Sequence, residues 1–360
     1  CDARWTSWPQ VQERAIADGN VMVWRMTASV GNIMRALTFL VPLARLLEVG
    51  FIINSELFPA FRTAFEPGLI KWDLDPKPFF QRASGIERGI GPDNRHALMF
   101  RDGFMILSDL QLELLVAIME DDGRSNERIK KSFGKQHRSK LRNSLLGAKL
   151  DPALPCAWNI LFRRSTAMVA SMEAHSPWGT TRNPIGTHRR YNAWHIRTSE
   201  GENAEWFNPA IHTYIFHDHG SADVCPIYLS TIDIVNEACP TLATGGTGDV
   251  PVYISSNSKS MAKNCSVFAG AHNVEAGFAD LGIDARYSHT AFSKDPNTAT
   301  QAFIDFLYLM DASVVIRTTS SFSRAGTDMK GFNCSKINVG GQLVSKISMC
   351  LPPACVETTL

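Results

Sequence analysis

Apolar and polar positions follow two different periods in the first part of this chain. Val21 to Met26 has the composition of a strand, and Ile33 to Leu47 carries apolar residues at helical spacing. Phe51 to Asn54 follows as a short apolar run. A strand, a glycine-containing turn, a helix and a second strand in this order predict the start of an α/β layer.

The second half of the chain contains further short apolar runs. They occur at Tyr191 to Ile196, Val224 to Ser230, Val250 to Ser255 and Val314 to Arg317. Thr298 to Leu309, directly before the last run, has the spacing of a helix. Buried strands that alternate with helices predict a parallel, doubly wound sheet.

The length of 360 residues favours two domains. The segment from Ser176 to Arg190 is rich in Pro, Gly, Thr and Arg and has no period, which indicates a boundary. We therefore expect an N-terminal α/β lobe over residues 1–185, a C-terminal Rossmann-like lobe over residues 186–330, and a tail over residues 331–360.

Composition limits the classes of partner. The formal net charge of +1 gives no general attraction to a nucleic acid or an acidic membrane, so we expect no nucleic-acid partner and only a local anion site. The most apolar early stretch, Ala36 to Ile53, contains Pro42, Arg45 and Glu48 and is too polar for a membrane span. A membrane anchor outside these residues is left open.

The chain has eight cysteines, and none lies in a CxxC pair or a cluster with zinc-type spacing. Two triplets, Asn264-Cys265-Ser266 and Asn333-Cys334-Ser335, match the acceptor pattern for N-glycosylation, although such triplets also occur by chance. Together they favour a disulfide-bonded protein of the ER or Golgi lumen. We expect a bridge among Cys334, Cys350 and Cys355 to hold the C-terminal tail.

Candidate chemistry lies where predicted strands end. His195-Ile196-Arg197 leaves a strand and enters a polar loop that contains glycine. In open α/β sheets ligands bind outside the carboxyl ends of strands, and Arg197 could hold a phosphate with its bidentate fork. The alternative is a salt bridge, the commoner role of an isolated arginine at a strand end.

Two further turns follow predicted strands. Thr318 to Ser323 is rich in small hydroxyl residues, which allow a diphosphate to approach the backbone; an ordinary helix N-cap is the alternative. Ser255-Ser256-Asn257 could hydrogen-bond a base or a ribose, or simply cap the next helix.

In order and spacing these motifs resemble those of the GDP-fucose-dependent fucosyltransferase superfamily. This superfamily comprises bacterial nodulation fucosyltransferases, core α-fucosyltransferases of N-glycans and protein O-fucosyltransferases. The matching segments are His195-Ile196-Arg197, Phe207-Asn208-Pro209, Ser255-Ser256-Asn257, Asp311-Ala312-Ser313 and Ser320 to Ser323, with Ser29 to Arg35 and Pro155 to Arg163 in the N-terminal half.

The resemblance implies a GT-B-like α/β fold, with two Rossmann-like lobes and a cleft between them. It further implies a GDP-fucose donor, a glycan or glycoprotein acceptor, and no metal or other cofactor. No Asp-x-Asp triplet lies near the proposed donor site, because Asp73-Leu74-Asp75 belongs to the N-terminal lobe. The residues that it implies for donor binding are Gly31, Asn32, Arg35, His195, Arg197, Asn257, Asp311, Ser320, Ser321 and Ser323.

For catalysis, the resemblance implies that Arg197 neutralises the leaving diphosphate. A general base must also deprotonate the acceptor hydroxyl, and the candidates are Glu202 first, Glu205 second and then Glu200. The alternative for each carboxylate is a solvated loop position.

The chain departs from the family pattern in three places, one of which is Ser29-Val30 in place of a glycine pair in the N-terminal turn. Thr198 and Ser199 stand where core fucosyltransferases have a second Arg and an Asp. Ser255-Ser256-Asn257 replaces a Thr-Asp-Asp turn. Another nucleotide sugar, or an inactive glycan-binding protein with the same fold, therefore remain alternatives.

Overall fold

The fold was analysed in a computed structural model of the whole chain. It describes residues 3–18, 21–25, 30–46, 49–55, 58–75, 97–100, 103–106, 154–179, 190–197, 221–239, 250–282, 296–318, 320–339 and 342–356. The chain divides into two compact units: unit 1 contains Cys1–Ala28 and Ala36–Arg163, and unit 2 contains Ser29–Arg35 and Arg164–Leu360. The predicted mixed α/β class is confirmed.

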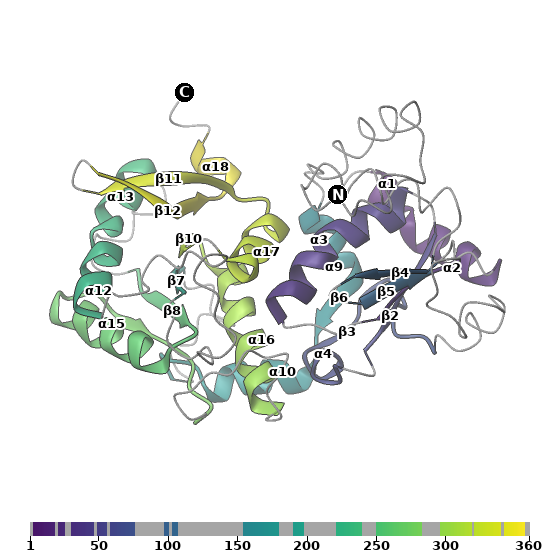
Figure 1. Cartoon of the computed structure of the whole chain (residues 1–360), viewed down its shortest axis with the longest axis horizontal. Helices are drawn as coiled ribbons and strands as arrows, with labels where there is room; N and C mark the ends of the chain where they lie inside the picture. Colours follow the sequence, from purple (N-terminus) through teal and green to yellow (C-terminus); the bar gives the residue numbers. More distant parts are fainter. Residues whose placement is uncertain are drawn as a thin grey trace. The chain divides into compact units, whose positions relative to one another are not determined.

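Unit 1 is built around a small mixed sheet. Its elements are α1 (Ala3–Thr6), α2 (Trp8–Ala17), β1 (Val21–Arg25), α3 (Val30–Leu46), β2 (Gly50–Asn54), α4 (Ala60–Ala64), β3 (Phe65–Pro67), β4 (Ala97–Phe100), β5 (Gly103–Ile106), α9 (Leu154–Leu161) and β6 (Phe162–Arg164) (Figure 1). The first residues of α3, up to Arg35, and the last residue of β6, Arg164, belong to unit 2. In the described residues the sheet order is β2-β1-β5-β4, with β1 and β2 parallel. The predicted strand, helix and strand of this region are confirmed.

A glutamine side chain joins α2 to the edge of this sheet. Gln12 is 2% exposed, and its amide nitrogen donates to the Phe51 carbonyl at 2.9 Å while its amide oxygen accepts from the Phe51 N–H at 2.7 Å. The side chain thus acts as the hydrogen-bonding partner of Phe51 at this edge of β2, and it satisfies both backbone groups of that residue.

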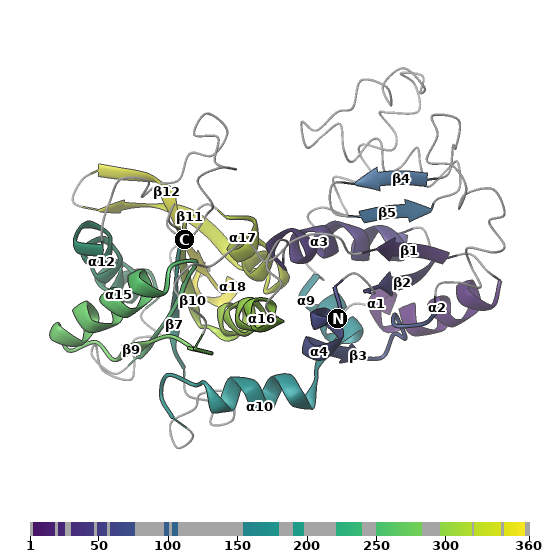
Figure 2. The same ribbon diagram turned by 60° about the horizontal axis from the view of Figure 1, so that its bottom comes forward.

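Unit 2 contains a larger sheet with helices on both faces. Its elements are α10 (Thr166–Ala174), β7 (Asn192–Ile196), α12 (Ser221–Leu229), α13 (Thr231–Ala238), β8 (Val252–Ser256), α15 (Lys259–Ala271), β9 (Ala276–Gly277), α16 (Pro296–Asp311), β10 (Val314–Thr318), α17 (Ser321–Met329), β11 (Asn333–Val339), β12 (Gln342–Leu351) and α18 (Pro353–Val356). Figure 2 shows α12 and α15 on one side of β7 and β10, and α16 and α17 on the other.

The central strands of unit 2 are parallel and fully covered. The strand order in the described residues is β11-β12-β10-β7-β8-β9, and β10, β7, β8 and β9 run parallel. Every residue of β7 and β8 is buried. Burial on both faces is typical of parallel strands between helical layers, so the α/β reading of this half is confirmed.

Two expectations need correction. The run Val224 to Ser230 lies in helix α12, not in a strand; its buried residues Val224, Cys225 and Tyr228 have helical spacing, which a short apolar run does not reveal. The sheet is mixed, because β12 pairs antiparallel with β10 and β11 with β12. Unit 2 begins at Arg164 in this part of the chain and includes residues 331–360.

Three disulfides fasten unit 2. Cys225–Cys265 joins α12 to α15, Cys239–Cys355 joins the end of α13 to α18, and Cys334–Cys350 joins directly opposite residues of β11 and β12. The expected bridge within the last cysteines is thus present between Cys334 and Cys350, whereas Cys355 pairs outside that group. In the part of the chain that the structure describes, no helix is both long and apolar enough to cross a bilayer.

The Gln12 contact predicts a specific loss of stability. We expect Gln12→Ala to lower the free energy of unfolding of unit 1 by about 2 to 4 kcal/mol, because both backbone groups of Phe51 lose their partner in a buried place. Gln10→Ala is the control, since Gln10 is exposed on the same helix. Urea unfolding followed by tryptophan fluorescence measures both variants, and equal midpoints for them would contradict the proposed role of Gln12.

Candidate functional site

The parallel register of unit 2 places three polar residues in one row. His195 of β7 lies opposite Ser255 of β8 on one side and opposite Arg317 of β10 on the other. The strands end directly after this row, at Ile196, Ser256 and Thr318. The carboxyl ends of β7, β8 and β10 therefore meet at one edge of the sheet, where open α/β proteins bind ligands.

His195 is held from several directions. It is 4% exposed, and its ring lies 5.6 Å from the ring of Phe322 in a stacked arrangement. The hydroxyl of Tyr228 donates to its carbonyl at 2.7 Å, and the hydroxyl of Thr318 lies 3.4 Å from its Nδ1. The imidazole consequently has a defined position between β10 and the first turn of α17.

His195 carries no charge near neutral pH. Burial, together with the positive charges of Arg197 and Arg317, lowers the pKa of its imidazole from 6.5 to about 3. A neutral imidazole can donate one hydrogen bond and accept another. His195 therefore offers hydrogen bonding at the strand ends, while the positive charge there comes from the two arginines.

Arg197 follows the last residue of β7 and has a fixed backbone. Its N–H donates to the hydroxyl of Thr318 at 3.1 Å, and Thr318 is 1% exposed. The side chain of Arg197 is half-buried. An arginine that directly follows a strand and whose backbone is held by a hydrogen bond is suited to binding an anion outside the sheet.

The serine turn caps helix α17, as the N-cap alternative predicts. The hydroxyl of Ser320 accepts the N–H of Phe322 at 3.3 Å. Ser323 is fully buried and donates to the carbonyl of Thr318 at 3.4 Å, which ties the helix to the end of β10. The side chain of Ser321 lies outside the described residues. The capping role and an anion at the same helix N-terminus are compatible, because a cap satisfies only one of the free N–H groups.

Within unit 2, the first turn of α3 touches the first turn of α17. A Cβ built on Gly31 would lie 3.1 Å from the Cβ and 3.3 Å from the backbone nitrogen of Phe322. This close approach explains why glycine suits position 31. Asn32 and Arg35 follow in α3, but their side chains lie outside the described residues.

A buried carboxylate that the sequence analysis missed lies beside Ser255. Asp305 of α16 accepts from the hydroxyl of Tyr253 at 2.6 Å, the amide of Gln301 at 3.0 Å and the hydroxyl of Ser255 at 3.3 Å. Burial raises the pKa of Asp305 to about 7, and the three hydrogen bonds oppose that rise. The available signal was an acid, four residues after Gln301, inside an otherwise apolar helical run.

The remaining predicted residues are separate from this row or undescribed. Asn257 follows β8 directly and is half-buried. Asp311 is the last residue of α16, before the amino end of β10, and its carboxylate is bonded by Arg164. It therefore lies at the opposite end of β10 from Thr318. Glu202 and Glu205 lie outside the described residues, and the described ones include no group of His, Cys, Asp and Glu that could hold a metal ion.

Comparison with known proteins gives matches by structure alone. No family model matches the chain, and no curated protein matches it. A solved structure of the NodZ α-1,6-fucosyltransferase co-crystallised with GDP is similar over 92% of this chain and 98% of that chain, with 12% identity and a TM-score of 0.41. A selenomethionine structure of fucosyltransferase NodZ from Bradyrhizobium covers the same shares with 11% identity and a TM-score of 0.42.

His195 and Asp305 predict opposing dependences of stability on pH. The pKa of His195 falls from 6.5 to about 3 on folding, so the unfolded chain binds more protons between these values and stability rises with pH. The pKa of Asp305 rises from 3.8 to about 7, so the folded chain binds more protons and stability falls as pH rises. Between about pH 4 and 6.5 the two contributions nearly cancel.

Substituting either residue should reveal the contribution of the other to the pH dependence of stability. We expect His195→Gln to lose stability as pH rises from about 4 to 7, by about 1 kcal/mol per pH unit, and Asp305→Asn to lose stability as pH falls below about 6.5. Urea unfolding at a series of pH values measures both slopes relative to the unsubstituted chain. Slopes of the same sign in the two variants would show that the assigned pKa directions are wrong.

Proposed function

We propose that this chain is a glycosyltransferase that binds a nucleotide sugar at the carboxyl ends of β7, β8 and β10. The observation that carries the proposal is that Arg197, neutral His195 and the capped N-terminus of α17 meet where the parallel strands of the mixed sheet end. A guanidinium and a helix N-terminus together favour a diphosphate. The proposed arrangement is GT-B-like, with two Rossmann-like lobes that enclose the donor.

The proposed donor is GDP-fucose. Support comes from the resemblance of His195-Ile196-Arg197 and Ser320 to Ser323 to the motifs of GDP-fucose-dependent enzymes. In this proposal Gly31, Asn32 and Arg35 contribute from α3, and Asn257 contacts the base or ribose. Asp311, whose carboxylate is bonded by Arg164, would act through that ion pair rather than on the diphosphate.

The proposed reaction is a single displacement with inversion. An acceptor hydroxyl oxygen forms a bond to the anomeric carbon of the sugar, while the bond from that carbon to the diphosphate oxygen breaks. Glu202, or Glu205 in its place, takes the proton of the acceptor. Arg197 stabilises the negative charge that develops on the leaving diphosphate, so the proposal requires no metal ion.

The setting that we propose is the lumen of the secretory pathway. Support comes from three disulfides, Cys225–Cys265, Cys239–Cys355 and Cys334–Cys350, which are typical of oxidising compartments. The acceptor asparagines Asn264 and Asn333 are both exposed. The proposed acceptor substrate is a glycan or a glycoprotein.

Arg197 provides the first test of the donor site. We expect GDP to raise the melting temperature of the unsubstituted chain, and Arg197→Ala to weaken GDP about 10- to 100-fold, since it removes a charge-assisted contact worth about 1.5 to 3 kcal/mol. Arg163→Ala is the control, because Arg163 forms an exposed ion pair with Glu66. Thermal shift and calorimetry with GDP, UDP and CMP sugars measure the effect.

The same panel separates the alternatives. Stronger stabilisation by a UDP or CMP sugar would assign another donor. Such a change of donor would fit Ser255-Ser256-Asn257, where hydroxyl and amide groups replace the two acids of the family's Thr-Asp-Asp turn. No shift with any nucleotide at millimolar concentration would support an inactive glycan-binding protein. Unchanged transfer activity in Arg197→Ala would refute the role proposed for the guanidinium.

The general base gives a second test. We expect Glu202→Gln to lower the rate of sugar transfer by about 100- to 10,000-fold without changing GDP affinity, because the base acts only on the acceptor proton. Glu205→Gln should then have a much smaller effect. Steady-state kinetics with a hydroxyl acceptor and GDP calorimetry measure the two quantities. If Glu205→Gln alone abolishes transfer, the base is Glu205.

A further inference from the structure

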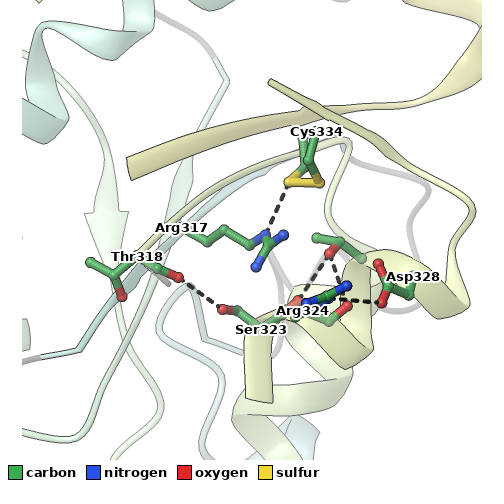
Figure 3. The surroundings of a disulfide bond; sticks show 8 residues. Arg317, Thr318, Ser323, Arg324, Asp328 and Cys334 are labelled. Atoms are coloured by element: carbon green, nitrogen blue, oxygen red, sulfur yellow. Dashed lines mark hydrogen bonds and ion pairs between the residues drawn. A yellow bond between two sulfur atoms is a disulfide. The ribbon is translucent and has the colours of Figure 1, made fainter. Parts of the chain in front are cut away.

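Arg317 has a charge for which the described structure provides no ion-pair partner. Its side chain extends from β10 between α17 and the β11–β12 hairpin and is partly buried (Figure 3). The Asp328 carboxylate, whose field raises the pKa of Arg317, is paired instead with Arg324 at 3.6 Å. Burial is the larger influence and lowers the pKa of Arg317 on balance, but a guanidinium remains charged in proteins.

The hydrogen bond that Arg317 does make is to a sulfur atom. Its Nε–H donates to the Sγ of Cys350 at 3.2 Å, and Cys350 is bonded to Cys334 (Figure 3). A neutral disulfide sulfur is a weak acceptor and does not compensate a positive charge. A buried cation without a counter-charge is costly, so the site is suited to a negative charge on this sulfur.

The two ends of this disulfide differ in access. Cys334 is exposed on β11, the edge strand of the sheet, whereas Cys350 is fully buried in β12. A thiolate from solvent can therefore reach the sulfur of Cys334. The sulfur of Cys350, on the inner side, lies against the guanidinium.

We propose that Cys334–Cys350 is a reactive disulfide and that Cys334 is a modification site for a small thiol. The incoming thiolate forms a bond to the Sγ of Cys334, and the bond between Cys334 and Cys350 breaks. Its electron pair stays on Cys350, which leaves as a thiolate beside Arg317. The negative charge passes from the incoming sulfur to Cys350, and no proton or external oxidant is needed.

The guanidinium favours this direction of attack. A neighbouring cation lowers the pKa of a cysteine thiol, and thiol–disulfide exchange is faster when the leaving thiol has a lower pKa. The other two disulfides of unit 2 offer an internal comparison. Their cysteines, Cys225, Cys265, Cys239 and Cys355, are all at most 2% exposed, so no thiol reaches either end in the folded chain.

The folded protein, treated with excess reduced glutathione and then quenched with acid, tests this proposal. Free thiols are alkylated, and peptides are identified by mass spectrometry. We expect glutathione on Cys334, an alkylated Cys350, and intact Cys225–Cys265 and Cys239–Cys355 bonds. Glutathione on Cys350, or reaction of all three disulfides at similar rates, would overturn the proposal.

Matched arginine variants isolate the role of the charge. We expect Arg317→Met to slow the exchange at Cys334 by about tenfold or more, because the leaving thiolate loses its cation. Arg317→Lys should retain part of the rate, since it keeps a positive charge. Arg324→Met is the control, because Arg324 is exposed and paired with Asp328. The two intact disulfides report that each variant is folded, and an unchanged rate in Arg317→Met would refute the inference.

Discussion

The register of β7 between β8 and β10 is the constraint on which the rest of unit 2 depends. Trp194, Ile254 and Ile316 lie side by side in one row and pack into the core under α12 and α15. Successive side chains of a strand point to opposite faces. The next row, with His195 between Ser255 and Arg317, must therefore point to the face that α16 and α17 cover. A shift by one residue would exchange the two rows and put charged groups into the core. The hydrophobic packing of one face thus determines where the chemistry of the other face can lie.

Burial then decides the charges in the polar row. His195 is neutral because desolvation and two nearby arginines disfavour its cation, and the pKa of Asp305 rises because its carboxylate is buried among hydroxyl and amide donors. Arg317 lies opposite His195 on the neighbouring strand, and its guanidinium donates a hydrogen bond to a sulfur rather than to a carboxylate. A thiolate on Cys350 would cancel part of that charge. The redox state of an edge-strand disulfide and the electrostatics at the strand ends are therefore physically connected.

The sequence predicts the parts of this fold that depend on local pattern. β1, α3, β2, β7, β8, α16 and β10 follow from period and length, and the strand-end position of Arg197 follows from them. The run from Val224 to Ser230 was misread because a short apolar run fits a buried helix equally well. Asp305 and Arg317 were missed because their importance arises from neighbours far along the chain, such as Tyr253 and Cys350, and a single sequence does not reveal those pairings.

The β11–β12 hairpin covers the edge of β10, the strand that carries Arg317 and Thr318. β12 pairs with β10 along Val315 to Thr318, so without the hairpin β10 would be an exposed edge strand and Arg317 would lie open to solvent. Cys334–Cys350 joins the two strands of this hairpin to each other, and Cys239–Cys355 joins the helix after it to the end of α13. Because β12 follows β10 by more than twenty residues in the sequence, the strand that carries Thr318 lies between two neighbouring strands only after β12 has also formed. Arg317 consequently contacts the sulfur of Cys350 only when the β11–β12 hairpin is paired with β10.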